Sequence, residues 1–482
     1  MSLFQKALGC AALYCLLLAA GGEARASDSG APYTVKAAYE SLSLPAGESM
    51  GMLGLGVERQ FNENFSAGVG TWTAVRGERG GFITIGFQGT AHVPVSGPFG
   101  LEAGAFVGAG GGRGGATLSG GGLMLRGYAG VVYDLEELGR IGAGVSYVDF
   151  PNGGAIDSTQ PVVFYAIPFG SSSRQFDGLA YDQNSLAVVS KLVRVRSGSR
   201  DLSGKVQDDF TLLGVEWRSY FDDDIFLRFE AAGAAGGSST GYMQVLVGAG
   251  LQIPLSDTIW IDGSLGLGGG GGGNVDTGGG FLVDAGADLR CALGDDLFAA
   301  AGVSYQRAPN GSLSAICPSL EIGGTFGKKS QHHENEKLPV RVRMVTQRYF
   351  NGADGWRSHD ANQDVDNLGV QFDYFPVPWV YVTGQALAAY DGQAGAYMIG
   401  LVGGGLHQTI AGPLFVEAEG LVGAAGGGGL AMGSGLAWQV NGGVGVQVSK
   451  DVALLATVGR LDAVNGPFKA DVVGLSLAFG GR

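Results

Sequence analysis

Residues 283–291 read Val-Asp-Ala-Gly-Ala-Asp-Leu-Arg-Cys, and apolar side chains occupy every second position of this stretch. Asp284, Asp288 and Arg290 share one parity, while Val283 and Leu289 share the other. A strict period of two is typical of a β-strand with one polar and one apolar face. The stretch therefore predicts a strand, and the recurrence of its pattern predicts the fold class.

The same alternation recurs on both sides of this strand. We expect eight strands in the middle third of the chain, beginning near residues 189, 210, 225, 241, 258, 278, 297 and 314. Tight connections such as 254–258 and 293–296 alternate with longer ones such as 197–209 and 308–314. Short turns on one rim and longer loops on the other are typical of outer-membrane barrels.

The strand pattern belongs to a unit that occurs three times. The tripeptide Gly-Tyr-Met at 241–243 recurs as Ala-Tyr-Met at 396–398, 155 residues later, and Asn-Gly at 310–311 recurs at the same offset. The first third aligns with the second at offsets of 158 to 160 residues. A period this long matches a whole small domain rather than a solenoid repeat. We expect barrel units at 27–170, 188–327 and 339–482, with linkers at 171–187 and 328–338.

The N-terminus predicts export. Lys6 precedes an apolar stretch at 7–20, and Ala24-Arg25-Ala26 follows with a small-x-small cleavage pattern, so residues 1–26 read as a signal peptide. The chain carries a net charge of −14, which argues against a nucleic-acid partner. Only 15% of residues are charged and 45% are hydrophobic, which suits an outer surface that faces lipid.

Closed barrels are the only way in which such a chain could cross a membrane. After residue 26 the sequence has no uninterrupted apolar run of 18 residues. In lipid every backbone N–H and C=O needs a partner, and only helices and closed barrels supply one. We therefore predict an all-β fold of membrane-spanning, antiparallel up-and-down barrels.

The polar parity of the middle third predicts the barrel interior. We expect a mixed, neutral set of paired charges there, because buried charges persist only when they are paired. An eight-stranded barrel is just wide enough to be filled by such side chains. The expected set is Arg194, Arg196, Arg218, Arg228, Arg290, Glu216, Glu230, Asp262, Asp284 and Asp288.

One acidic position is shared by all three units, as Glu102, Asp262 and Glu417. A salt-bridge partner that holds the interior together is the favoured interpretation, and an ion or proton relay is the alternative. Neither interpretation needs a metal or a cofactor, and we expect neither.

Each unit ends on a strand that finishes with a Phe-Gly pair, at 169–170, 326–327 and 479–480. With this ending, each third resembles a small eight-stranded barrel of the OmpA/OmpX kind from Gram-negative outer membranes. The resemblance implies a bacterial outer-membrane location and the barrel assembly machinery as a partner. We favour three such barrels, because 328–338 is polar and the sequence shows no plug domain; one 24-stranded barrel is the alternative.

Glycine-rich segments at 108–122, 266–280 and 423–435 fall on the long-loop rim of each unit. Glycine permits close backbone approach, so these segments could face lipopolysaccharide, a surface polysaccharide or a protein, or could simply form tightly curved loops. Cys291 and Cys317 should lie at opposite rims, beyond disulfide reach.

The sequence argues against catalysis. Ser146 and Ser304 occupy the type of strand on which outer-membrane lipid hydrolases place a serine, but no His lies near them in the sequence, and His332 and His333 show no ligand spacing. We therefore expect a non-enzymatic outer-membrane protein with a structural role, or a surface-interaction role through its glycine-rich loops. A porin-like channel or export pore is the first alternative, and a lipid-modifying enzyme is the second.

Overall fold

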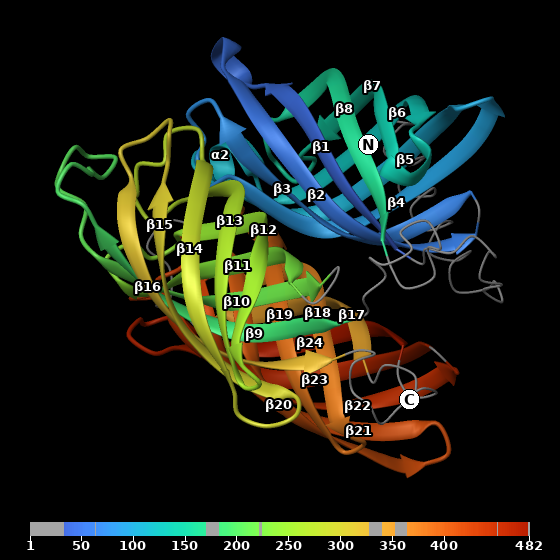
Figure 1. Ribbon diagram of the computed structural model, residues 1–482, viewed down its shortest axis with the longest axis vertical. Helices are drawn as coiled ribbons and strands as arrows, with labels where there is room; N and C mark the ends of the chain where they lie inside the picture. Colours follow the sequence, from blue (N-terminus) through green and yellow to red (C-terminus); the bar gives the residue numbers. More distant parts are fainter. Residues whose placement is uncertain are drawn as a thin grey trace.

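The chain folds into three separate closed barrels (Figure 1). The computed structural model describes residues 33–62, 64–169, 183–220, 224–326, 340–351, 364–450 and 452–480. Each barrel has eight antiparallel strands in sequence order, and its first strand pairs with its last. The predicted fold class is confirmed, and the single 24-stranded barrel is wrong because each third satisfies its own sheet edges.

The strands of the three barrels have similar lengths. The first barrel comprises β1 (Tyr33–Ser43), β2 (Ser49–Asn62), β3 (Phe65–Arg76), β4 (Ile83–Ser96), β5 (Phe99–Gly111), β6 (Leu123–Asp134), β7 (Arg140–Asp149) and β8 (Asp157–Phe169). The second comprises β9 (Asn184–Val195), β10 (Phe210–Tyr220), β11 (Ile225–Gly237), β12 (Met243–Ser256), β13 (Ile259–Gly271), β14 (Phe281–Ala292), β15 (Leu297–Arg307) and β16 (Ser314–Phe326). The third comprises β17 (Val340–Asn351), β18 (Val365–Val377), β19 (Val380–Asp391), β20 (Met398–Ala411), β21 (Leu414–Gly426), β22 (Leu436–Ser449), β23 (Val452–Ala463) and β24 (Lys469–Gly480).

Among the residues that the structure describes, helical structure occurs only in the first barrel. It consists of α2 (Gly115–Ser119) and the short 3-10 turns η1 (Pro45–Gly47) and η2 (Glu136–Leu138). No helix in the described part of the chain is long and apolar enough to span a membrane.

Four of the eight strand starts predicted for the middle third, at 210, 225, 297 and 314, are those of β10, β11, β15 and β16. β9 begins at Asn184, so the last residues of the segment predicted as a linker belong to the barrel. Small and apolar residues occupy both faces of 185–189, which hides the alternation there. The signal peptide at 1–26 and most of both predicted linkers lie outside the described residues.

The outer faces of the barrels carry a broad apolar surface. Exposed side chains gather on the strands toward the short-turn rim, and Leu265, Leu320 and Val458 are each about two-thirds exposed, at 67%, 67% and 66%. Soluble monomers rarely expose such large contiguous apolar surface. The outer faces are therefore suited to hydrocarbon rather than water.

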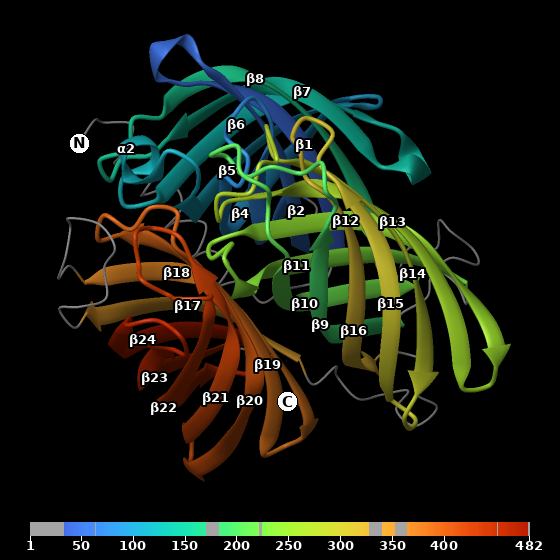
Figure 2. The same cartoon turned by 90° about the vertical axis from the view of Figure 1, so that its left-hand side faces the viewer.

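The three barrels meet in a ring near their long-loop ends (Figures 1 and 2). The third strand of each barrel packs against the fifth strand of another: β3 on β13, β11 on β21, and β19 on β5. The outward faces of β4, β12 and β20 are buried at their long-loop ends and become exposed toward their short turns. The contact between barrels is thus concentrated at one end of the molecule.

Candidate functional site: sealed interiors and a glycine junction

The interior of the second barrel is built around Arg218, which is 1% exposed. Its guanidinium lies 2.5 Å from Glu216 and 3.4 Å from Glu321, and it also pairs with Asp262. Asp288 lies slightly farther away, at 3.7 Å. Inward positions on four different strands, β10, β13, β14 and β16, supply these groups, so the network links the sheet across the lumen.

Arg228 forms a second centre beside the first. It lies 2.6 Å from Glu216 and 3.0 Å from Asp284, and it pairs with Glu230 as well. Arg290 completes the predicted set with a contact of 3.2 Å to Asp262. Glu216 therefore bridges the Arg218 and Arg228 centres, and the network is continuous.

The prediction that Arg194 and Arg196 point inward is wrong. Both side chains are exposed on the outside of β9, and Val193 points into the lumen instead. Alternation shows that the two faces of a strand differ, but it does not show which face points into the lumen. Near the long-loop rim the lumen is apolar, so the valines point inward there and the arginines point outward.

Two interior charges of the second barrel were missed from the sequence. Lys191 lies 2.5 Å from Glu230, and Glu321 reaches Arg218. The expected neutral balance is also wrong, because carboxylates outnumber basic groups among the described interior residues. The basic groups are Lys191, Arg218, Arg228 and Arg290, and the acidic groups are Glu216, Glu230, Asp262, Asp284, Asp288 and Glu321.

The shared acid on the fifth strand is paired in every barrel. Glu102 pairs with Lys36, Asp262 with Arg218 and Arg290, and Glu417 with Arg341 at 2.6 Å. The basic partner comes from the first strand in barrels one and three, but from the second and sixth strands in barrel two. The acidic residue is kept in all three barrels, but its basic partner comes from different strands. This favours a structural ion pair over an ion or proton relay with one shared geometry.

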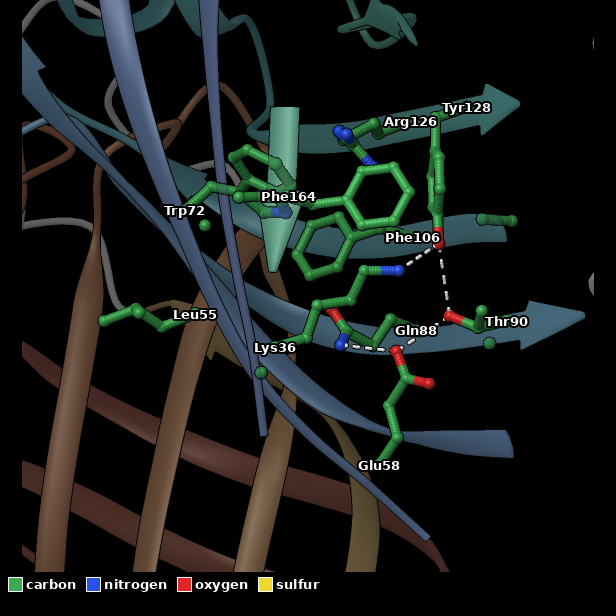
Figure 3. Close-up of a pocket in the computed structure, with 15 residues that line it drawn as sticks. Lys36, Leu55, Glu58, Trp72, Gln88, Thr90, Phe106, Arg126, Tyr128 and Phe164 are labelled. Carbon is green, nitrogen blue, oxygen red and sulfur yellow. Dashed lines mark hydrogen bonds between the residues drawn. The ribbon is translucent and has the colours of Figure 1, made fainter. Parts of the chain in front are cut away.

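The first barrel packs its charges among aromatic rings (Figure 3). The Lys36 ammonium lies 4.5 Å from the centre of the Tyr128 ring and 4.4 Å from that of Phe164, and it also bonds the Tyr128 hydroxyl. Glu58 accepts hydrogen bonds from Gln88 and Thr90, at 2.8 and 2.9 Å. The cavity left between these groups measures about 20 Å³, which is room for about one water.

An apolar cap closes the lumen above the charged layer. Phe82, Tyr242 and Tyr397 occupy corresponding positions and lie fully buried in the apolar clusters of barrels one, two and three. The next residues in the chain, Ile83, Met243 and Met398, point outward and meet in a cluster between the barrels. One loop position therefore seals each lumen, and its neighbour seals the space where the three barrels meet.

The glycine-rich segments lie between the barrels. The carbonyl oxygens of Gly120, Gly278 and Gly433, which correspond in the three units, each accept a hydrogen bond from another barrel. The donors also correspond: the backbone N–H of Gly395 at 3.2 Å, that of Gly80 at 3.0 Å, and the hydroxyl of Thr240. The junction thus repeats a hydrogen bond between corresponding positions three times around a closed ring, twice from a backbone N–H and once from a hydroxyl.

Close approach explains why these positions are glycine. Gly122, Gly280 and Gly435 have φ of +102°, +96° and +93°, a region that L side chains rarely adopt. A Cβ at each would lie 2.1 to 2.4 Å from the carbonyl oxygen of an alanine in the neighbouring barrel. The alanines are Ala389, Ala74 and Ala234, respectively.

The serines considered for catalysis serve the ion-pair networks. Ser146 Oγ lies 2.5 Å from Glu40 and Ser304 Oγ lies 2.8 Å from Asp284, both as hydrogen-bond donors. His407 is bound to Glu417 in the third barrel, while His332, His333 and His359 lie outside the described residues. Within the described residues, no group of three His, Cys, Asp or Glu side chains could hold a metal ion.

The two cysteines are free thiols in different surroundings. Cys317 is 1% exposed inside the second barrel, whereas Cys291 lies on the outer face near the short-turn end of β14. We expect N-ethylmaleimide to label Cys291 but not Cys317 in native, detergent-solubilised protein, with both labelled after denaturation. Peptide mass spectrometry would measure this, and native labelling of Cys317 would contradict the sealed lumen.

Comparison with known proteins gives only distant structural similarities. No family model matches the sequence, and no curated protein matches it in sequence. The ferric enterobactin receptor of Pseudomonas aeruginosa is 11% identical, with a TM-score of 0.29, 94% of this chain and 82% of the receptor covered. OpdQ of the same organism is 11% identical, with a TM-score of 0.25, 94% of this chain and 98% of OpdQ covered.

A structure titled as a de novo design of transmembrane β-barrels has 15% identity and a TM-score of 0.21. It covers 30% of this chain and is itself covered over 98% of its length. At these scores we transfer no function from any of the three proteins.

Proposed function

We propose that this chain is a non-enzymatic integral protein of the bacterial outer membrane, in which three sealed barrels form one membrane-embedded structural body. The observation that carries the proposal is the reversal of polarity in each barrel: apolar side chains cover the outside, and paired charges fill the inside. A water-soluble barrel would have the opposite arrangement, with its apolar residues in the core.

The membrane location is supported by physics and by the start of the sequence. Closed sheets leave no unpaired backbone edge, which is what a hydrocarbon environment requires. The predicted signal peptide at 1–26 supplies the export step. In this location the barrel assembly machinery and outer-membrane lipid, including lipopolysaccharide, are the proposed partners.

A structural role is favoured over a porin-like channel because both layers of the lumen are filled. Arg218 and Arg228 join opposite walls of the second barrel, and Tyr242 lies in the apolar cap above them. Passive conduction needs a continuous wet path, and side chains occupy that path here. The glycine-rich segments are largely engaged between the barrels, so a polysaccharide or protein would meet the other long loops, such as 197–209.

Planar-bilayer recording tests this function. We expect the purified full chain to insert into lipid and to give no stable open-channel steps at up to 100 mV, with an open porin as the positive control. Carbonate extraction of the reconstituted vesicles would verify insertion. Reproducible conductance steps from inserted protein would instead support the channel alternative, and failure to insert would remove the membrane proposal altogether.

A further inference from the structure

The second barrel has a cluster of three exposed arginines on its outer surface: Arg194 on β9, Arg196 just after β9, and Arg307 at the end of β15. Arg196 donates its backbone N–H to the carbonyl of Ser314 at 2.8 Å, and Arg307 pairs with Ser314 from the other side. Arg194 pairs with Ile316 in the next outward row. Adjacent strands lie about 4.8 Å apart, so Arg196 and Arg307 flank Ser314 at roughly 10 Å from each other.

None of these three guanidinium groups forms an ion pair with a carboxylate of the described residues. The carboxylate of Asp209 accepts the backbone N–H of Val195 at 2.8 Å and forms no ion pair with these arginines. Exposed arginines of the third barrel behave differently, since Arg348 pairs with Asp364 and Asp366, and Arg460 with Asp462 and Asp471. The second barrel therefore presents positive charge that the protein itself does not neutralise.

The arginines stand at the long-loop end of an apolar strip on β15 and β16. Within this strip Val303, Leu320 and Ile322 are 49%, 67% and 60% exposed. We call the combination of Arg194, Arg196 and Arg307 with this strip the arginine face. A ligand that matches both parts has anionic groups at one end and a hydrocarbon chain at the other.

Among the described residues, the arginine face is a feature of the second barrel. The position of Arg307 on the seventh strand corresponds to Asp149 in the first barrel and Asp462 in the third. The face lies away from the main ring contacts, because these use β10, β11, β13 and β14 of this barrel. β16 meets the third barrel at its last residue, Phe326, whose ring packs on Tyr374, four residues beyond Ile322. If these arginines served only a general attraction to an anionic membrane surface, all three barrels would be expected to carry them.

We propose that the arginine face binds a phosphate-bearing lipid of the leaflet at the long-loop rim. The lipid phosphate would bond Arg196 and Arg307 on either side of Ser314, with Arg194 beside them, and an acyl chain would lie along Val303, Leu320 and Ile322. Arg–phosphate pairs are charge-assisted and often bidentate, which favours phosphate over a neutral sugar. This inference rests on the proposed function, because it needs the outer faces to meet lipid.

Native mass spectrometry of the full chain, with lipid A as the probe, tests the proposal. We expect the wild type to retain bisphosphorylated lipid A about tenfold more strongly than R194Q/R196Q/R307Q, since the triple variant loses three charge-assisted contacts to phosphate, each of modest strength at an exposed site. The matched control, R348Q/R460Q, removes arginines that are already paired and should retain lipid A as the wild type does.

Three results would overturn the proposal. They are equal retention by the wild type and the triple variant, equal retention of dephosphorylated lipid A, and displacement of the lipid by millimolar inorganic phosphate. The last would assign the arginines to a free anion. Carbonate extraction of each variant from vesicles keeps this outcome separate from failure of the proposed function, because insertion should be unchanged in all of them.

Discussion

Replacing Arg218 by methionine is expected to destabilise the second barrel by about 3–5 kcal/mol, the usual effect of removing one partner from a buried ion-pair network. Methionine preserves much of the side-chain volume, so the loss is electrostatic rather than a cavity effect. Glu216 keeps Arg228 and Asp262 keeps Arg290, but Glu321 loses its basic partner. Carboxylates already outnumber basic side chains in this lumen, and the substitution would remove one more basic side chain.

Urea unfolding in detergent would measure the loss, and hydrogen exchange would locate it. Amides of β9 to β16 should exchange faster in R218M, while those of the other two barrels stay protected. The control is R196M, the same substitution at an exposed arginine of the same barrel, which should shift stability by less than about 0.5 kcal/mol. Adding Glu321→Gln to R218M should recover part of the loss, and equal effects of R218M and R196M would contradict a structural network.

The barrels could be predicted because their determinants are local. Period-two alternation, turn residues and a repeat of about 155 residues predicted eight strands per third, and the polar segment 328–338 favoured separate closure over one 24-stranded barrel. The orientation of a strand was predictable where charges alternate with apolar residues along its full length, as in 283–291. It failed at 193–196, because the lumen changes there from charged to apolar and alternation does not show which face is which.

The partners of the interior charges could not be predicted, because they depend on register across the barrel. Asp262 is separated from Arg218 by 44 residues, and Glu40 from Arg126 by 86, yet each pair meets inside one lumen. Local sequence patterns also do not predict the junction between the barrels. One signal was present, however: both sets of junction glycines, Gly120, Gly278 and Gly433 and Gly122, Gly280 and Gly435, keep the repeat spacing.

Valine at Gly280 and Gly435 is expected to release the second barrel from the other two. Gly280 abuts Ala74 of the first barrel and Gly435 abuts Ala234 of the second, so the two substitutions open both junctions of barrel two. Each Cβ would overlap a carbonyl oxygen, and each valine would also be strained at positive φ. The test is to insert protease sites within 171–182 and 327–339, cleave, and measure particle mass in detergent.

The ring makes this prediction depend on how many junctions are opened. After cleavage the wild type should keep its full mass, and so should G280V, because barrels one and two remain joined through barrel three. G280V/G435V should lose one third of its mass, and the triple variant with Gly122→Val should fall to single barrels. The control G97V/G204V/G412V places valine at positive φ where no atom lies within 4 Å, so it carries strain without overlap and should remain whole. Separation of the cleaved wild type, or of the control, would mean that the connecting chain and not the glycine junction holds the three barrels together.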